Sequence, residues 1–138
     1  MQLPEEGAGE AEGALVIQLM QDESEHPIPT ELRALYRLIA DAFASGDFGL
    51  VHNRIEGVQL ADNETAEYIS DCVQDYGDPL AGLDESTWET SCYTHMSDHW
   101  EALVDLATRN EPVSDLTLHT RIYLDPNLRI VIDSVHVP

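Results

Sequence analysis

Apolar residues recur at intervals of three and four in two stretches of the chain, and this spacing predicts two helices. The first helix is expected over about residues 31–45, and Gly46 stands where a helix-ending glycine belongs. The second helix is expected to begin at a cap formed by Asp62 or Asn63 and to end at Gly77. Its inner stripe consists of Ile69, Cys72, Val73 and Tyr76.

Beyond Gly77 the hydrophobic pattern changes to a period of two, which is typical of strands. Four strands are expected there, and a further short strand is expected between the two helices. They lie near residues 54–60, 88–95, 99–107, 115–124 and 128–137. The sequence therefore predicts the α+β class, with two N-terminal helices packed on one face of a curved antiparallel meander of four to five strands.

Two short connections set the expected register of these strands. Asp125-Pro126-Asn127 predicts a three-residue hairpin connection, and Met96-Ser97-Asp98 is expected to form a second one. In the resulting register one sheet face is apolar and can bury the helices. Trp88, Cys92 and Trp100 are expected on this face, and both tryptophans are expected in the core.

The chain is expected to be a single α+β domain over residues 28–138, preceded by an acidic, largely disordered leader over residues 1–27. The leader holds seven acidic residues and no Arg. Its first thirteen residues are rich in Glu, Gly and Ala, a composition that cannot bury a core. The apolar run at residues 14–20 is either a strand or a helical turn that docks late, because periodicity does not decide between them.

The charge of the chain excludes several classes of partner. Its 138 residues include 27 acids and 6 basic residues, which give a formal net charge of −21. Nucleic acid is therefore not an expected partner, because binding it requires phosphate neutralisation, and neither is an anionic membrane. No apolar run reaches the roughly 20 residues of a membrane span. The two cysteines, Cys72 and Cys92, are expected as small buried side chains, which fits a cytoplasmic protein.

The opposite face of the predicted sheet is more polar and carries the candidate catalytic residues. In the expected register His119 pairs with Asp133, and His95 pairs with His99 at a hairpin tip. A histidine held by a carboxylate is the group that general acid–base catalysis needs. The same pairs are also ordinary neighbours on a solvated sheet face, which is the structural alternative. The candidates are His95, His99, Glu101, His119, Arg121 and Asp133.

The spacing of Cys92, His95 and His99 resembles that of zinc ligands. On a strand, however, Cys92 and His95 point to opposite faces, and no fourth ligand is apparent. We therefore expect no metal site and no bound cofactor. The chain also contains no glycine-rich phosphate loop and no Gly-x-Ser-x-Gly elbow.

The second helix carries a row of acidic residues at intervals of three and four. They lie within an arc of about 80° of the helix, opposite its apolar stripe, and no Arg or Lys interrupts them. Such a row is either the solvated face of a very acidic protein or a surface for a basic partner, which it would attract at a high rate. The residues are Glu64, Glu67, Asp71, Asp75 and Asp78.

Four short motifs resemble a family of small, uncharacterised bacterial proteins. They are Trp88-Glu89-Thr90-Ser91, Asp98-His99-Trp100, Leu103-Val104-Asp105-Leu106 and Ser114-Asp115-Leu116. The resemblance covers roughly residues 28–138 and, because that family is a domain of unknown function, it implies no catalytic residue. The helix end Ala44-Ser45-Gly46-Asp47-Phe48, followed by a long curved sheet, also resembles the cone-shaped folds related to nuclear transport factor 2. Those folds include ligand-binding proteins, small isomerases and dehydratases, and immunity proteins that neutralise toxins.

Three hypotheses follow from these observations. The first is a non-enzymatic protein that binds a basic protein partner, as an immunity or inhibitor protein does. The second is a small-molecule-binding protein, or a lyase- or isomerase-like enzyme, that uses the polar sheet face. The third is adaptation to high salt or to a GC-rich genome, in which case the charge carries no information about a partner. A homodimer is compatible with all three.

Overall fold

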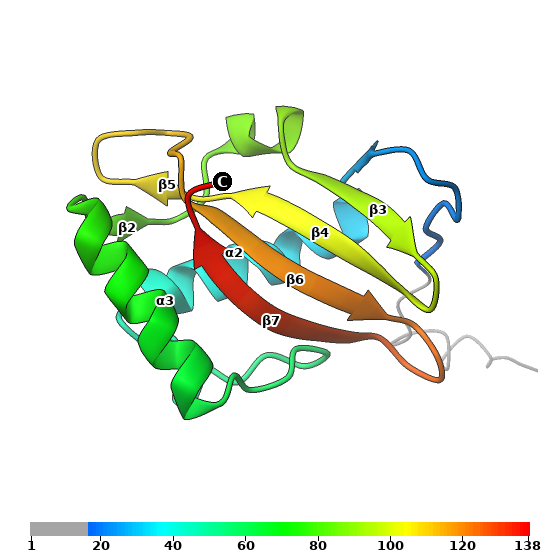
Figure 1. Cartoon of the computed structure of the whole chain (residues 1–138), viewed down its shortest axis with the longest axis horizontal. Helices are drawn as coiled ribbons and strands as arrows, with labels where there is room; N and C mark the ends of the chain where they lie inside the picture. Colours follow the sequence, from blue (N-terminus) through cyan, green and yellow to red (C-terminus); the bar gives the residue numbers. More distant parts are fainter. Residues whose placement is uncertain (1–16) are drawn as a thin grey trace, which may run out of the picture.

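Five strands of the described chain, residues 17–138, form one antiparallel sheet in the computed structural model (Figure 1). Its strand order is β1-β3-β4-β6-β7, and the two short strands β2 and β5 pair separately. The α+β class and the antiparallel sheet are thus confirmed. The strands are β1 (His26–Pro27), β2 (Leu80–Ala81), β3 (Cys92–Met96), β4 (His99–Asp105), β5 (Ala107–Thr108), β6 (Thr117–Tyr123) and β7 (Arg129–His136).

Both predicted helices are present. Helix α2 spans Thr30–Ala44 and α3 spans Asn63–Tyr76. The carboxylate of Asp62 caps α3 by accepting a hydrogen bond from the backbone N–H of Thr65, at 2.8 Å. The helix ends at Gly77, whose φ of +86° is favourable only for a residue without a Cβ.

Helix α2 provides one wall of the hydrophobic core and lies across the inner face of the sheet (Figure 1). Its buried side chains recur every three or four residues, so that they form one stripe. Within the core, the hydroxyls of Tyr36 and Thr120 are hydrogen-bonded at 2.7 Å. Burial raises the pKa of the Tyr36 phenol above its usual range. Helix α3 contacts β7 and lies along that edge of the sheet.

Part of the predicted leader packs on the domain. Leu19 is buried, and the backbone N–H of Met20 donates to the Tyr93 hydroxyl at 2.8 Å. The indole N–H of Trp100 in turn donates to the Met20 carbonyl at 2.9 Å. His26 then pairs with Tyr93 as part of β1. Residues 1–16 of the predicted leader, with the start of its apolar run, lie outside the described residues.

The predicted turn between β3 and β4 is wrong by one residue. Met96 pairs with His99, so the connection consists of Ser97 and Asp98 alone. Because side chains alternate along a strand, this one-residue difference exchanges the two faces of β3. Tyr93 therefore points into the core, whereas Cys92, expected on the apolar face, shares the outer face with its partner Leu103.

Two predicted strand segments are also wrong. Trp88 lies in a 3₁₀ helix, η1 (Glu85–Glu89), because Asp84 caps that turn by accepting from the Ser86 N–H. Residues 54–60 form a loop with a single parallel bridge from Val58 to Ile130. Gly57, at φ +88°, interrupts the extended conformation that a strand there would need.

Trp88 and Trp100 remain core side chains, since they are only 6% and 8% exposed. Replacing either with Ala is expected to lower the free energy of unfolding by about 3–5 kcal/mol, through lost burial and the cavity left behind. Urea denaturation measures the change, with Tyr68→Ala as a control at a 52% exposed aromatic residue. Wild-type stability in both tryptophan variants would contradict the packing described here.

The Tyr36–Thr120 bond provides a second prediction about the core. Tyr36→Phe leaves the buried Thr120 hydroxyl without its partner, which is expected to cost about 1–3 kcal/mol of stability. Adding Thr120→Val removes the orphaned hydroxyl, so the double variant is expected to be no less stable than Tyr36→Phe. Thermal and urea unfolding of both single variants and of the double variant give the coupling. If the stability losses of the two single variants add up to the loss of the double variant, the hydrogen bond contributes nothing to stability.

Candidate functional site

The outer face of the sheet, opposite α2, carries most of the candidate catalytic residues. The predicted pairing of Glu101 with Arg121 across β4 and β6 is confirmed. The pairing of β6 with β7 follows the prediction from Tyr123–Arg129 to Thr120–Ile132. Beyond that point a β-bulge shifts the register.

The bulge changes the partner of Asp133. His119 pairs with Ser134, so Asp133 is left without a cross-strand partner. The two oxygens of its carboxylate instead share the Nε–H of Arg121, at 2.9 and 3.0 Å from Nε. This contact raises the pKa of the Arg121 guanidinium. The predicted pair of His119 and Asp133 is therefore wrong, because the bulge moves Asp133 out of register.

Glu101 occupies the centre of the observed cluster. Its Oε1 lies 3.2 Å from Nε2 of His119, and its Oε2 lies 3.6 Å from Nε2 of His99. Nδ1 of His99 is 2.8 Å from the Asp98 carboxylate, and this hydrogen bond lowers the pKa of Asp98. Two imidazoles thus flank one carboxylate on this face.

The remaining candidate, His95, does not join this cluster. It pairs with Trp100 rather than with His99, and its ring lies 5.0 Å from the indole, centroid to centroid. The two-residue turn is the reason, since it turns His95 to the inner side of β3. Cys92 lies on the opposite face from His95. Among residues 17–138, no three His, Cys, Asp or Glu side chains are placed to hold a metal ion.

The outer side of α3 carries four exposed carboxylates, which we call the acidic face: Glu64, Glu67, Asp71 and Asp75. None of them forms a salt bridge within the described chain. Asp78, predicted as the fifth member, instead links the end of the helix to another loop. It accepts hydrogen bonds from the backbone and side-chain N–H groups of Asn110 at 3.2 and 2.9 Å. Bonds from Thr108 and Asn110 lower the pKa of Asp78.

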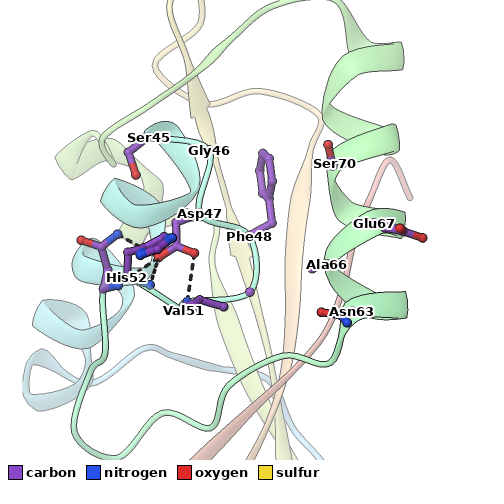
Figure 2. A pocket seen from close by; sticks show the side chains of 12 residues that line it. Ser45, Gly46, Asp47, Phe48, Val51, His52, Asn63, Ala66, Glu67 and Ser70 are labelled. Carbon is purple, nitrogen blue, oxygen red and sulfur yellow. Dashed lines mark hydrogen bonds between the residues drawn. The ribbon is translucent and has the colours of Figure 1, made fainter.

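A groove of about 660 Å³ is lined by α3 on one side and by the loop at residues 45–53 on the other (Figure 2). Asp47 organises the loop: its carboxylate accepts hydrogen bonds from the backbone N–H groups of Val51, His52 and Asn53, each at 2.9 Å. The Asn53 side chain donates a fourth. Burial raises the pKa of Asp47, but these bonds more than offset it, so the pKa lies below its ordinary value of 3.8.

The loop contacts α3 at one point, Gly49. A Cβ at Gly49 would lie 3.4 Å from Cγ2 of Val51 and 3.8 Å from Cβ of Ala66, which is ordinary contact without spare room. Leu50, at φ +59°, is buried and anchors the loop in the core. Because the loop is fixed at both points, the groove is a preformed feature of the fold.

The sequence arguments missed this groove. Hydrophobic periodicity carries no information on a loop whose shape depends on one carboxylate. A signal was nevertheless present, since Asp47 follows a helix-ending glycine and precedes Asn53 by six positions. An Asp in that position is typical of a side chain that accepts bonds from the backbone just after it.

Comparison with protein families shows to which family the chain belongs. The model of a domain of unknown function, DUF7668, matches residues 40–138, which is more than half of the chain. The chain belongs to this family. No curated protein and no solved structure matches it, so the resemblance to the folds related to nuclear transport factor 2 stays a prediction. None of the helices in residues 17–138 has the length and apolar character that crossing a bilayer requires.

The DUF7668 match starts inside α2, whereas the resemblance in the sequence was expected from about residue 28. It includes the outer face of the sheet, the acidic face and the whole groove. All the candidate sites described here therefore lie within the part of the chain that defines the family.

The pKa of Asp47 yields a pH prediction. Its folded-state pKa is lowered, so its ionised form stabilises the fold above pH 3.8, and this contribution is lost as the pH falls through the lower folded value. Asp47→Asn is therefore expected to be less stable than wild type at neutral pH, with a difference that shrinks in acid. Urea denaturation across pH measures this, with the exposed Asp125→Asn as control. A difference independent of pH would show that the charge of Asp47 is not involved.

Proposed function

We propose that this DUF7668 protein is non-enzymatic and binds a basic protein partner, in the manner of an immunity or inhibitor protein. The observation that supports this best is the acidic face of α3. Four exposed carboxylates share one side of this helix, and the helix contains no Arg, Lys or His. An acidic surface of this kind would steer a cationic partner and set its orientation.

None of the six arginines of the described chain forms a salt bridge with α3, and several of them have partners elsewhere. Arg37 pairs with Glu85, Arg121 pairs with Asp133, and Nε of Arg33 donates to the Ile28 carbonyl. The acidic face is left without such compensation. Like charges one turn apart cost a few tenths of a kcal/mol per pair in an isolated helix. A cationic partner would relieve this repulsion on binding.

The outer face of the sheet gives less support to the small-molecule or enzymatic alternative. Its guanidinium and its carboxylates bond to groups of the same face: Arg121 to Asp133, and Glu101 to His119. An anionic substrate would therefore have to displace Asp133 before it reached Arg121. A cluster of charges that satisfy one another is a common way to stabilise the face of a sheet.

Charge reversal on α3 tests the proposal. Glu67→Lys combined with Asp71→Lys is expected to slow association with the partner, because it removes the local negative potential. The double variant is expected to be as stable as wild type or slightly more stable, since it relieves repulsion along the helix. The partner is captured from the source organism at low salt, and association rates are then measured for both proteins over a range of salt.

The matched control is Glu56→Lys combined with Asp125→Lys, which changes the net charge equally at exposed positions away from α3. If both double variants slow association equally, only the overall charge matters. If no basic protein is captured, or if the α3 variant binds it as fast as wild type, the proposal is wrong. The acidity would then be that of a solvated surface, as adaptation to high salt predicts.

A further inference from the structure

We propose that the groove between α3 and the loop at residues 45–53 seats an extended segment of the basic partner. In this arrangement one arginine or lysine side chain of the segment lies against Ala66 and directs its charge to Glu67. This inference rests on the proposed function and adds to it the conformation of the partner and the place where it docks.

The shape of the groove supports an occupant of this kind. Its volume of about 660 Å³ accommodates several residues of peptide, and its walls are fixed before binding by the bonds to Asp47 and the burial of Leu50. A preformed groove avoids the entropic cost of ordering a loop on association. The exposed side chain of Val51 and the ring of Phe48 add apolar surface to the lining.

The charge of the lining favours a cationic occupant. Asp47 and Glu67 contribute to it, whereas no Arg or Lys does. The oxygens of Asp47 already accept four hydrogen bonds from its own loop, so Asp47 supplies negative potential without a free acceptor. Glu67 has no hydrogen bond within residues 17–138; it contributes to the lining of the groove, and its exposed side chain points away from the loop, toward the outer side of α3 (Figure 2). Glu67 is therefore the acceptor available to a guanidinium or ammonium group.

The wall formed by α3 favours an extended conformation of the occupant. Asn63, Ala66 and Ser70 lie on the side of α3 that faces the loop, and Glu67 lies on the outer side (Figure 2). The side chains of Asn63 and Ser70 form no hydrogen bond within the described chain, which leaves donors and acceptors free along this wall. An extended segment presents unpaired backbone N–H and C=O groups to such a wall, whereas a helix has already satisfied its own.

The probe for this proposal is the capped peptide acetyl-Ala-Arg-Ala-Arg-Ala-amide, titrated at low salt into the ¹⁵N-labelled protein. The largest amide shifts are expected at Gly49, Val51, Ala66 and Ser70. Ala66→Leu fills the groove without changing the charge, and it is expected to weaken binding by about fivefold or more, which corresponds to roughly 1 kcal/mol. Ala34→Leu makes the same substitution at an exposed position of α2 and is expected to leave the affinity unchanged.

Ser70→Leu provides a second obstruction of the groove if Ala66→Leu disturbs the loop. Glu67→Gln is expected to weaken binding of the arginine peptide, and the peptide with Gln in place of Arg is expected not to bind. If the α3 charge reversal weakens binding and neither leucine variant does, the groove proposal is wrong and the acidic face remains the docking surface. If the peptide shifts no groove amide, or if the Gln peptide binds equally well, the proposed cationic occupant is excluded. If neither charge reversal nor obstruction alters binding, both proposals fail.

Discussion

Burial of α2 against the inner face of the sheet is the constraint on which the other elements depend. The stripe of α2 that includes Tyr36 is covered only when β4, β6 and β7 present their apolar residues to it, and this requirement fixes which side of each strand is inward. The Tyr36–Thr120 hydrogen bond adds a directional contact to this core. Dispersion forces are not directional, so the bond helps to fix one arrangement of α2 on the sheet. Because side chains alternate along a strand, the same requirement places Glu101 and Arg121 on the outer face.

Periodicity was sufficient wherever burial decides the structure. It predicted both helices with their ends, and it predicted the pairing of β4 with β6 through Trp100 and Ile122. Periodicity did not predict the strand register where one residue more or less in a turn or a bulge changes it. The turn at Ser97 and Asp98 is shorter than expected, and the bulge at Asp133 leaves no trace in the alternation of polar and apolar residues. The predicted catalytic pairs depended on those two places, and for this reason they changed partners.

The outer face of the sheet and the acidic face of α3 both carry several charged side chains. They differ in whether those side chains have partners within the fold. On the sheet, Glu101 bonds to His119 and Asp133 bonds to Arg121, so these groups already have partners, whereas the buried Nε2 of His99 has no hydrogen-bond partner within the described chain. On α3 the carboxylates face solvent, and beside them lies a groove whose loop is held by hydrogen bonds to Asp47. Affinity depends on bonds that form only in the complex, and the four carboxylates of the acidic face have no salt bridge within the described chain to give up.

The order of elements along the chain also has a consequence for biosynthesis. Helix α2 leaves the ribosome long before the strands that cover it, since Tyr36 precedes Thr120 by 84 residues and Met20 precedes Trp100 by 80. Until β6 and β7 are synthesised, the apolar stripe of α2 is only partly covered by the rest of the fold. A domain arranged in this way completes its core only after its C-terminal strands have been synthesised, and until then its high net negative charge works against association with other chains.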